Sequence, residues 1–223
     1  TVAVVWLVAD WLASRGVRPR QTQVAAVATV AVLAVLSGLT VQQQAVWRDS
    51  FALWRHVVAT YPRCVAAYVN LGRAANDAGD KGAAIQWLRR AVEVDDRCVE
   101  AEANLGLLLV QTGRTDEALP HLPRALNLNP GWARAHYGLG LAAARHGNPD
   151  AAVEAFARAV QCDPNFGPAR ADLGAALVQT GRWAEAVGHL DIVLLARPDH
   201  VQARLNMAGA LIEIGRASCR ERV

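Results

Sequence analysis

The residues of this sequence that could do chemistry are its histidines and cysteines. Six histidines and four cysteines occur in 223 residues, but none of them forms an HExxH or CxxC pair, the spacings that bring two metal ligands together. No serine nucleophile motif, phosphate loop or carboxylate pair is found either. We therefore expect no catalytic residue, no metal and no cofactor in this chain. A net charge of +3 is too small for a nucleic-acid surface, so no nucleic-acid partner is expected.

The remaining residues repeat every 34 positions. A Leu-Gly pair recurs at this step from Leu71-Gly72 to Leu173-Gly174. Three more columns keep the same register, and they are Ala84, Ala118, Ala152 and Ala186, then Gly79, Gly113, Gly147 and Gly181, then Pro130, Pro164 and Pro198. A period of this length indicates stacked helix pairs, because one pair cannot bury its own apolar face.

With Leu-Gly at positions seven and eight, the pattern L-G, A-x3-[F/L], P resembles the tetratricopeptide repeat. The resemblance implies an all-α solenoid in which the glycines end first helices in a left-handed turn and the prolines end second helices. Cys162 falls on a core column, which predicts a buried thiol. The repeat domain is predicted over 63–213, with full repeats over 65–98, 99–132, 133–166 and 167–200 and an incomplete fifth from Val201.

In that family, positions two, five, six, nine, twelve and thirteen face a concave groove that binds proteins or extended peptides. The groove residues that the resemblance implies are Asn70, Arg73, Asn104, Gln111, Arg134, Tyr137, Arg145, Gln179 and Asn206. An asparagine at position six has a donor and an acceptor for a peptide backbone. Gly138 and Asp172 interrupt the asparagine series, and the alternative is that these amides only cap or bridge within a repeat. The basic residues do not complete a clamp for a C-terminal carboxylate.

Residues 1–46 are predicted to contact the lipid bilayer. The apolar run from Val24 to Val41 contains no charge and is long enough to cross a membrane. A buried core helix is the alternative, but such a helix normally has a polar stripe. The sequence begins at Thr1, so we expect a fragment. We predict the end of a truncated transmembrane helix over 1–14, a basic loop over 15–21 and a transmembrane helix over 22–46.

The loop 15–20 has three arginines and no acid, which favours the cytoplasmic side. Residues 48–63 also have three basic residues, but they belong to a folded domain, whose translocation depends little on charge. We therefore expect an integral membrane protein with extracytoplasmic repeats, in the periplasm or a lumen.

Residues 47–62 join the predicted span to the repeats. Pro62 and Trp54 extend two of the repeat columns backwards, which predicts a membrane-proximal half repeat. The junction V-W-R-D-S-x-x-L-W-R-H, through Trp47, Arg48, Asp49, Ser50, Leu53 and Trp54, also resembles polytopic glycosyltransferases related to protein O-mannosyltransferases with C-terminal repeats. That resemblance implies an upstream catalytic region with extracytoplasmic repeats, so whether the parent protein is an enzyme stays open. The alternative is a non-enzymatic membrane-anchored adaptor that assembles envelope complexes.

The last ten residues, 214–223, depart from the repeat. The small-residue column requires alanine at position 220, where Arg220 stands. Codons for IGRASCRERV, read in one frame, resemble a common sequencing adapter. We therefore predict that this segment is an assembly artefact.

Overall fold

The computed structural model describes residues 27–28, 31–32 and 50–220. Within these residues all regular structure is helical, and no strand is found. The predicted segments 1–14 and 15–21, and 22–46 apart from the two short pieces, lie outside the described residues. No helix in the described part has both the length and the apolar character needed to cross a bilayer.

Helix α3 (Ser50–Thr60) belongs to the first of two compact units, residues 1–60. It is found where the half repeat over 47–62 predicts a second helix. The glycosyltransferase-like motif at this junction overlaps the start of α3, and Asp49 lies outside the described residues.

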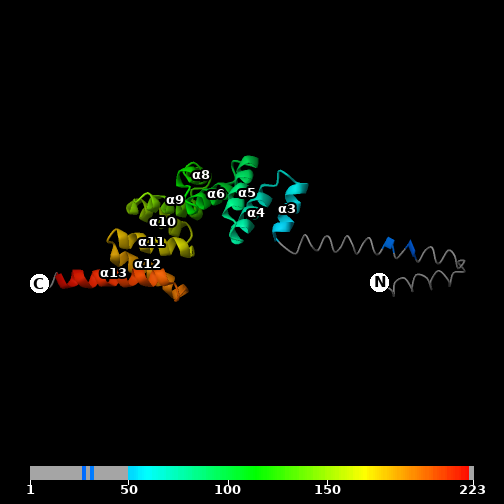
Figure 1. Cartoon of the computed structure of the whole chain (residues 1–223). Helices are drawn as coiled ribbons and strands as arrows, with labels where there is room; N and C mark the ends of the chain where they lie inside the picture. The colour runs from blue at the N-terminus through cyan, green and yellow to red at the C-terminus, as the bar shows by residue number, and fades with distance from the viewer. Residues whose placement is uncertain (1–26, 29–30, 33–49, 221–223) are drawn as a thin grey trace. The chain divides into compact units, whose positions relative to one another are not determined.

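Residues 61–223 form the second unit, in which first and second helices alternate (Figure 1). The first helices start 34 residues apart and are α4 (Val65–Asp77), α6 (Val99–Gln111), α9 (Ala133–Arg145) and α11 (Gly167–Gln179). The second helices are α5 (Lys81–Val94), α7 (Thr115–Ala118) with α8 (His121–Leu128), α10 (Pro149–Cys162) and α12 (Trp183–Ala196). Each pair packs against the next in chain order, so the predicted all-helical solenoid is confirmed.

The glycine column ends each first helix as predicted. Gly79, Gly113, Gly147 and Gly181 have φ values of 83°, 84°, 71° and 74°, the left-handed region in which a Cβ is strained. The second helices then restart on polar caps in two repeats, because the side-chain oxygens of Asp80 and Asn148 accept backbone N–H groups at 2.9 and 3.1 Å. These contacts satisfy donors that a helix start leaves free.

The Leu-Gly pairs place a glycine where the two helices of a repeat cross. A Cβ on Gly106 would lie 2.7 Å from Leu122 Cδ2, and one on Gly140 would overlap the ring of Phe156. The Leu122 side chain is fully buried and also lies against Gly138, where a Cβ would approach it to 2.7 Å. Small residues are therefore what allows these helices to approach.

The second repeat has a divided second helix and a buried carboxylate. Pro120 separates α7 from α8 because it has no N–H and its ring clashes with the preceding turn. Glu102 is fully buried; its Oε2 lies 2.6 Å from His121 Nδ1 and its Oε1 lies 3.3 Å from Arg124 Nε. These partners offset the cost of burying the charge.

The helix α13 (Val201–Arg220) departs from the repeat geometry. It continues past Gly215, which has no left-handed φ, and no second helix follows it within the described residues. Leu211 is 53% exposed, whereas Leu109 and Leu177 on the same repeat position are at most 1% exposed. The helix α13 thus lacks the left-handed turn that ends the other first helices.

The prediction of a buried thiol at Cys162 is wrong. Cys162 is the last residue of α10, and it is exposed. Leu128, which ends α8 at the same repeat position, is exposed as well. The second helix ends at this column, so the last turn extends beyond the core that covers the turns before it.

Candidate functional site

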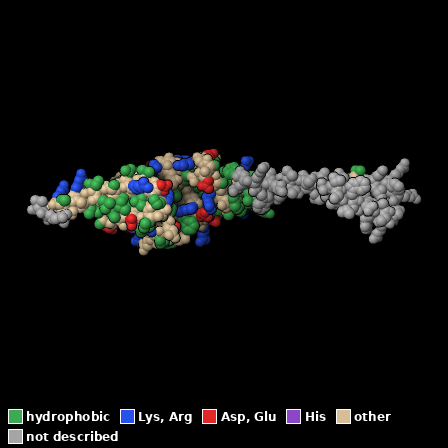
Figure 2. Space-filling view, turned by 90° about the horizontal axis from the view of Figure 1, so that it is seen from below, with side chains coloured by type: hydrophobic (Ala, Val, Ile, Leu, Met, Phe, Trp, Pro, Cys, Tyr) green, Lys and Arg blue, Asp and Glu red, His purple; other side chains and the backbone are tan. Residues whose placement is uncertain are grey.

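The first helices α4, α6, α9 and α11 line a cavity of about 370 Å³. Figure 2 shows a hollow on one face of the described part, with basic and acidic side chains around it. Five of the residues predicted to face the groove line this one cavity. We call it the central cavity, and the residues that line it are Gly72, Arg73, Asn76, Asp77, Leu88, Asn104, Leu107, Leu108, Gln111, Arg134, Tyr137, Phe166 and Pro168.

Asn104 is the polar centre of the central cavity. Its Oδ1 accepts a hydrogen bond of 3.1 Å from Arg134 on the next first helix. Its Nδ2 is buried and has no partner among the described residues. Since a buried donor without a partner costs free energy, this amide is available for an acceptor on a ligand. Arg73 also lines the cavity, and it is exposed with no hydrogen bond or ion pair to another described residue.

Tyr137 forms a rigid wall at the other end of the central cavity. Its ring centroid lies 5.0 Å from that of Phe166 and 5.7 Å from that of Phe156. Its hydroxyl donates a hydrogen bond of 2.9 Å to Asp172 Oδ2. Burial, reinforced by the Asp172 charge, raises the pKa of Tyr137, and burial also raises the pKa of Asp172 against the opposing effect of the Tyr137 hydroxyl and His200.

A second cavity of about 300 Å³ continues the groove beyond Tyr137. Tyr137 lines both cavities, and the second one also contains Asp172, His200 and the predicted Asn206. Arg197 contributes a further cationic side chain. The two cavities together give a path along successive first helices.

The residues at position six of the repeats do not all leave the same hydrogen-bonding group free, so they do not form a uniform series of asparagines along the groove. Asn70 donates its amide to Ala66 O at 2.8 Å, which leaves its oxygen for a ligand. Asn206 accepts from Gln202 Nε2 at 3.1 Å, so it offers its donor, as Asn104 does. At Gly138 the space for a side chain is taken by Leu122. Each of these three amides bonds to a neighbouring residue with one group, as the bridging alternative expects, while peptide binding through the other group stays a prediction.

The other predicted residues lie outside both cavities. Arg145 donates to the backbone oxygen of Gln111 over 3.4 Å at the edge of the groove. Gln179 is exposed and lines neither cavity, and Asn70 lines neither as well. The sequence alone did not indicate the apolar floor of Leu107, Phe166 and Pro168.

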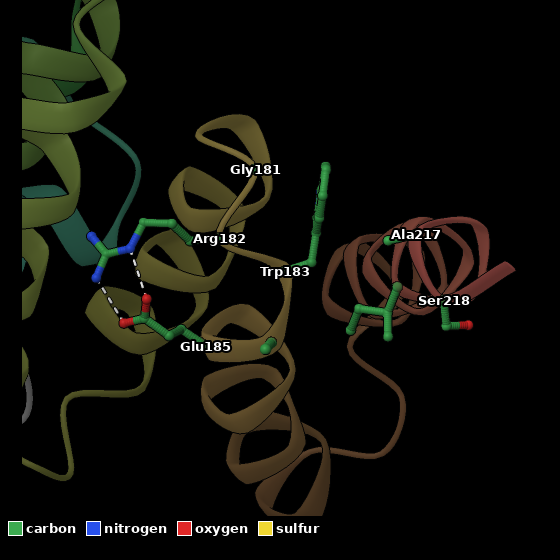
Figure 3. Close-up of a pocket in the computed structure, with 8 residues that line it drawn as sticks. Gly181, Arg182, Trp183, Glu185, Ala217 and Ser218 are labelled. Atoms are coloured by element: carbon green, nitrogen blue, oxygen red, sulfur yellow. Dashed lines mark hydrogen bonds and ion pairs between the residues drawn. The ribbon is translucent and has the colours of Figure 1, made fainter. Parts of the chain in front are cut away.

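A third cavity, of about 380 Å³, lies beside α13 and is shown in Figure 3. There Trp183 faces α13, while Arg182 and Glu185 point away from it and form an ion pair of 2.7 Å. Ile214, Ala217 and Ser218 line this cavity and belong to the segment predicted to be an artefact. We therefore assign no function to it.

Comparisons with known proteins agree on the fold. A family model described as tetratricopeptide repeat matches residues 42–97 and 104–165, and a second one with that description matches 143–202. A comparison with curated protein sequences gives no significant match.

Solved structures also resemble the chain. TTC0263, a thermophilic protein of Thermus thermophilus, is 24% identical with a TM-score of 0.59, covering 78% of this chain and 96% of its own. A MamA protein is 27% identical with a TM-score of 0.55, covering 74% and 90%. YrrB, described as having an unusual peptide-binding site, is 21% identical with a TM-score of 0.57, covering 73% and 84%.

Proposed function

Since the chain belongs to the tetratricopeptide-repeat family of protein-interaction modules, we propose that it binds extended segments of other proteins along the face lined by α4, α6, α9 and α11. The groove has the size of a ligand site and a mixture of apolar floor and a few placed polar groups. No covalent chemistry is required of the chain's own residues.

One observation carries this proposal: Asn104, which lines the central cavity, has a buried Nδ2 without a partner among the described residues. A backbone carbonyl of an extended segment is an acceptor that fits this donor. The described peptide-binding site of YrrB is a property of that protein, and at 21% identity the likeness supports the fold alone. The binding proposal here therefore rests on the residues of this groove.

The test uses the 223-residue chain in detergent micelles and an array of end-capped nonapeptides of random sequence. We expect a subset of the peptides to bind, and Asn104→Ala to weaken that binding about fivefold, the loss of one neutral hydrogen bond. Gln161→Ala, on the exposed face of the second helix α10, is the matched control. Equal affinities for wild type, Asn104→Ala and Gln161→Ala would rule the groove out.

We further propose that residues 1–46 anchor the repeats in a membrane, with the repeats on the extracytoplasmic side and loop 15–20 in the cytoplasm. The uncharged run from Val24 to Val41 and the arginines of the loop support this arrangement. A cysteine placed at exposed Gln86, in a chain whose own cysteines are serines, should react with a membrane-impermeant thiol reagent in intact cells. Reaction only after lysis would put the repeats in the cytoplasm.

We also propose that this chain is the C-terminal part of a glycosyltransferase-like membrane protein. It is supported by the junction motif from Trp47 to Trp54, and it places a catalytic region upstream of Thr1. The full reading frame tests it: further spans with acidic residues in an early extracytoplasmic loop are expected, and a start codon directly before Thr1 would favour the membrane-anchored adaptor instead.

A further inference from the structure

The central cavity has side-chain oxygens of Asn76, Asp77 and Gln111 in its lining, but its buried side-chain atom without a described partner, Asn104 Nδ2, is a donor. The oxygen of Asn104 accepts from Arg134, so its buried Nδ2 is the group left without a described partner. Arg73 keeps all of its donors free of described partners, and Arg134 uses one nitrogen on Asn104. The groove therefore offers a ligand acceptor one buried donor and two guanidinium groups.

An adjoining cavity of about 350 Å³ adds a second buried donor. It shares Arg73 and Arg134 with the central cavity, so the two guanidinium groups lie between the cavities. Trp132, which also lines it, has a buried Nε1 without a partner among the described residues. An indole nitrogen can only donate.

The acidic residues that line these cavities form no ion pair with Arg73 or Arg134, so both arginines can still bind a ligand carboxylate. Asp172 is engaged by the Tyr137 hydroxyl. Asp77 lines the central cavity and Glu100 the adjoining one, and neither forms an ion pair with Arg73 or Arg134. Two arginines and two carboxylates leave the region without a net charge, so selectivity has to come from short contacts and not from long-range attraction.

The floor beside these donors is apolar. Leu107, Phe166 and Pro168 line it together with the ring of Tyr137, which Phe166 and Asp172 hold in place. A rigid apolar wall lowers the ordering cost of binding a side chain against it. The second cavity continues on the far side of Tyr137, so a bound segment can run through the groove rather than end in it.

We propose that the groove selects extended segments in which an apolar side chain stands next to an internal aspartate or glutamate. The apolar side chain packs on Leu107 and Phe166, and the carboxylate accepts hydrogen bonds from Arg73 and Arg134, with Asn104 Nδ2 on the adjacent carbonyl. This selectivity rests on the proposed function of the groove. The partner group is the side-chain carboxylate of a residue inside the bound segment, and not the segment's C-terminal carboxylate.

The experiment measures dissociation constants of the 223-residue chain in micelles for four Gly-Ser nonapeptides, all capped at both ends. Their central pairs are Leu-Glu, Leu-Gln, Ala-Glu and Leu-Lys. We expect Leu-Glu to bind about tenfold tighter than Leu-Gln, because hydrogen bonds to a charged group are about twice as strong as neutral ones. Ala-Glu should also bind more weakly than Leu-Glu, and Leu-Lys should bind most weakly of all.

Two variants tie the preference to the residues named. Arg73→Gln removes a side chain that has no partner among the described residues, so it should fold normally and reduce the Leu-Glu to Leu-Gln ratio to about threefold or less. Arg134→Gln should reduce it as well. Arg158→Gln makes the same charge change at an exposed position on α10, outside both cavities, and should keep the ratio.

The outcomes separate this inference from the proposed function. Peptides that bind and lose affinity with Asn104→Ala, yet with equal affinity for Leu-Glu and Leu-Gln, would overturn the acidic preference and leave the groove intact. A requirement for a free C-terminal carboxylate would overturn it too. Failure of every peptide on the random array to bind would instead remove the proposed function itself.

Discussion

The hydroxyl of Tyr137 on α9 donates a 2.9 Å hydrogen bond to Asp172 on α11, which links two neighbouring first helices across the groove. Tyr137→Phe should lower the free energy of unfolding by about 1–2 kcal/mol, because a half-buried carboxylate loses its donor. Urea unfolding measures this change. Asp172→Ala removes the same bond from the other side, so the double variant should cost less than the sum of the two single variants. Additive costs would contradict the link.

Gly106 is packed against Leu122, whereas Gly188 has open space around it, so alanine at these two positions should have opposite effects on stability. Gly106→Ala places a Cβ 2.7 Å from the Leu122 side chain, and such overpacking costs about 1–3 kcal/mol. Gly188→Ala, in α12, meets no atom within 4 Å and should stabilise by about 0.5–1 kcal/mol through helix propensity. Thermal unfolding of both variants checks this, and a stabilised Gly106→Ala would show that the helices are not closely packed there.

The pH dependence of stability should contain a contribution from His189. Burial, and next the nearby Arg170, lower the pKa of His189, while Glu185 opposes them. The unfolded chain then binds the proton more readily, so this contribution to stability is present above about pH 6.5 and is lost as the pH falls through the lower folded-state pKa. His189→Gln should lose less stability than wild type between about pH 7 and pH 5. His146→Gln, at an exposed position after α9, is the control, and parallel curves for wild type and His189→Gln would contradict the prediction.

The exposed apolar side of α13 predicts that a second helix would stabilise the repeats. Replacing 216–223 with a copy of residues 182–198 restores the repeat register after Gly215. Covering Leu211, now 53% exposed, and its neighbours should raise the free energy of unfolding by about 2 kcal/mol or more. Urea unfolding tests this, and an unchanged midpoint would mean that the register does not continue past residue 215.

Resequencing the gene tests the predicted artefact over 214–223. A genome that encodes RASCRERV at this place would refute it.

Much of the fold follows from columns of single residues. The resemblance carried by the glycine column predicted the left-handed turns at Gly79 and Gly113, and the Leu-Gly pairs are found where the helices of a repeat cross. These features depend on backbone geometry and side-chain size, which one residue type can specify. The break between α7 and α8 was not predicted, although Pro120 signals it.

The groove was predicted less completely, because partners depend on neighbouring repeats. Position numbers alone indicated that Asn104 and Arg134 face the same groove, but not that Arg134 occupies the oxygen of Asn104. The asparagine series is interrupted at Gly138 because Leu122, a residue of the preceding repeat, leaves no space for a side chain there. Contacts of this kind depend on packing between repeats, so the 34-residue period of the sequence does not predict them.

Peptide binding in the groove is tested most directly by the NMR signal of the Asn104 side-chain amide in the 223-residue chain, titrated with the capped Leu-Glu nonapeptide. We expect this amide to shift and saturate together with the side-chain signals of Arg73 and Arg134, while residues on the exposed face of α10 stay unchanged. Saturating peptide that shifts only second-helix residues, or that leaves the Asn104 amide unmoved, would contradict binding at this site.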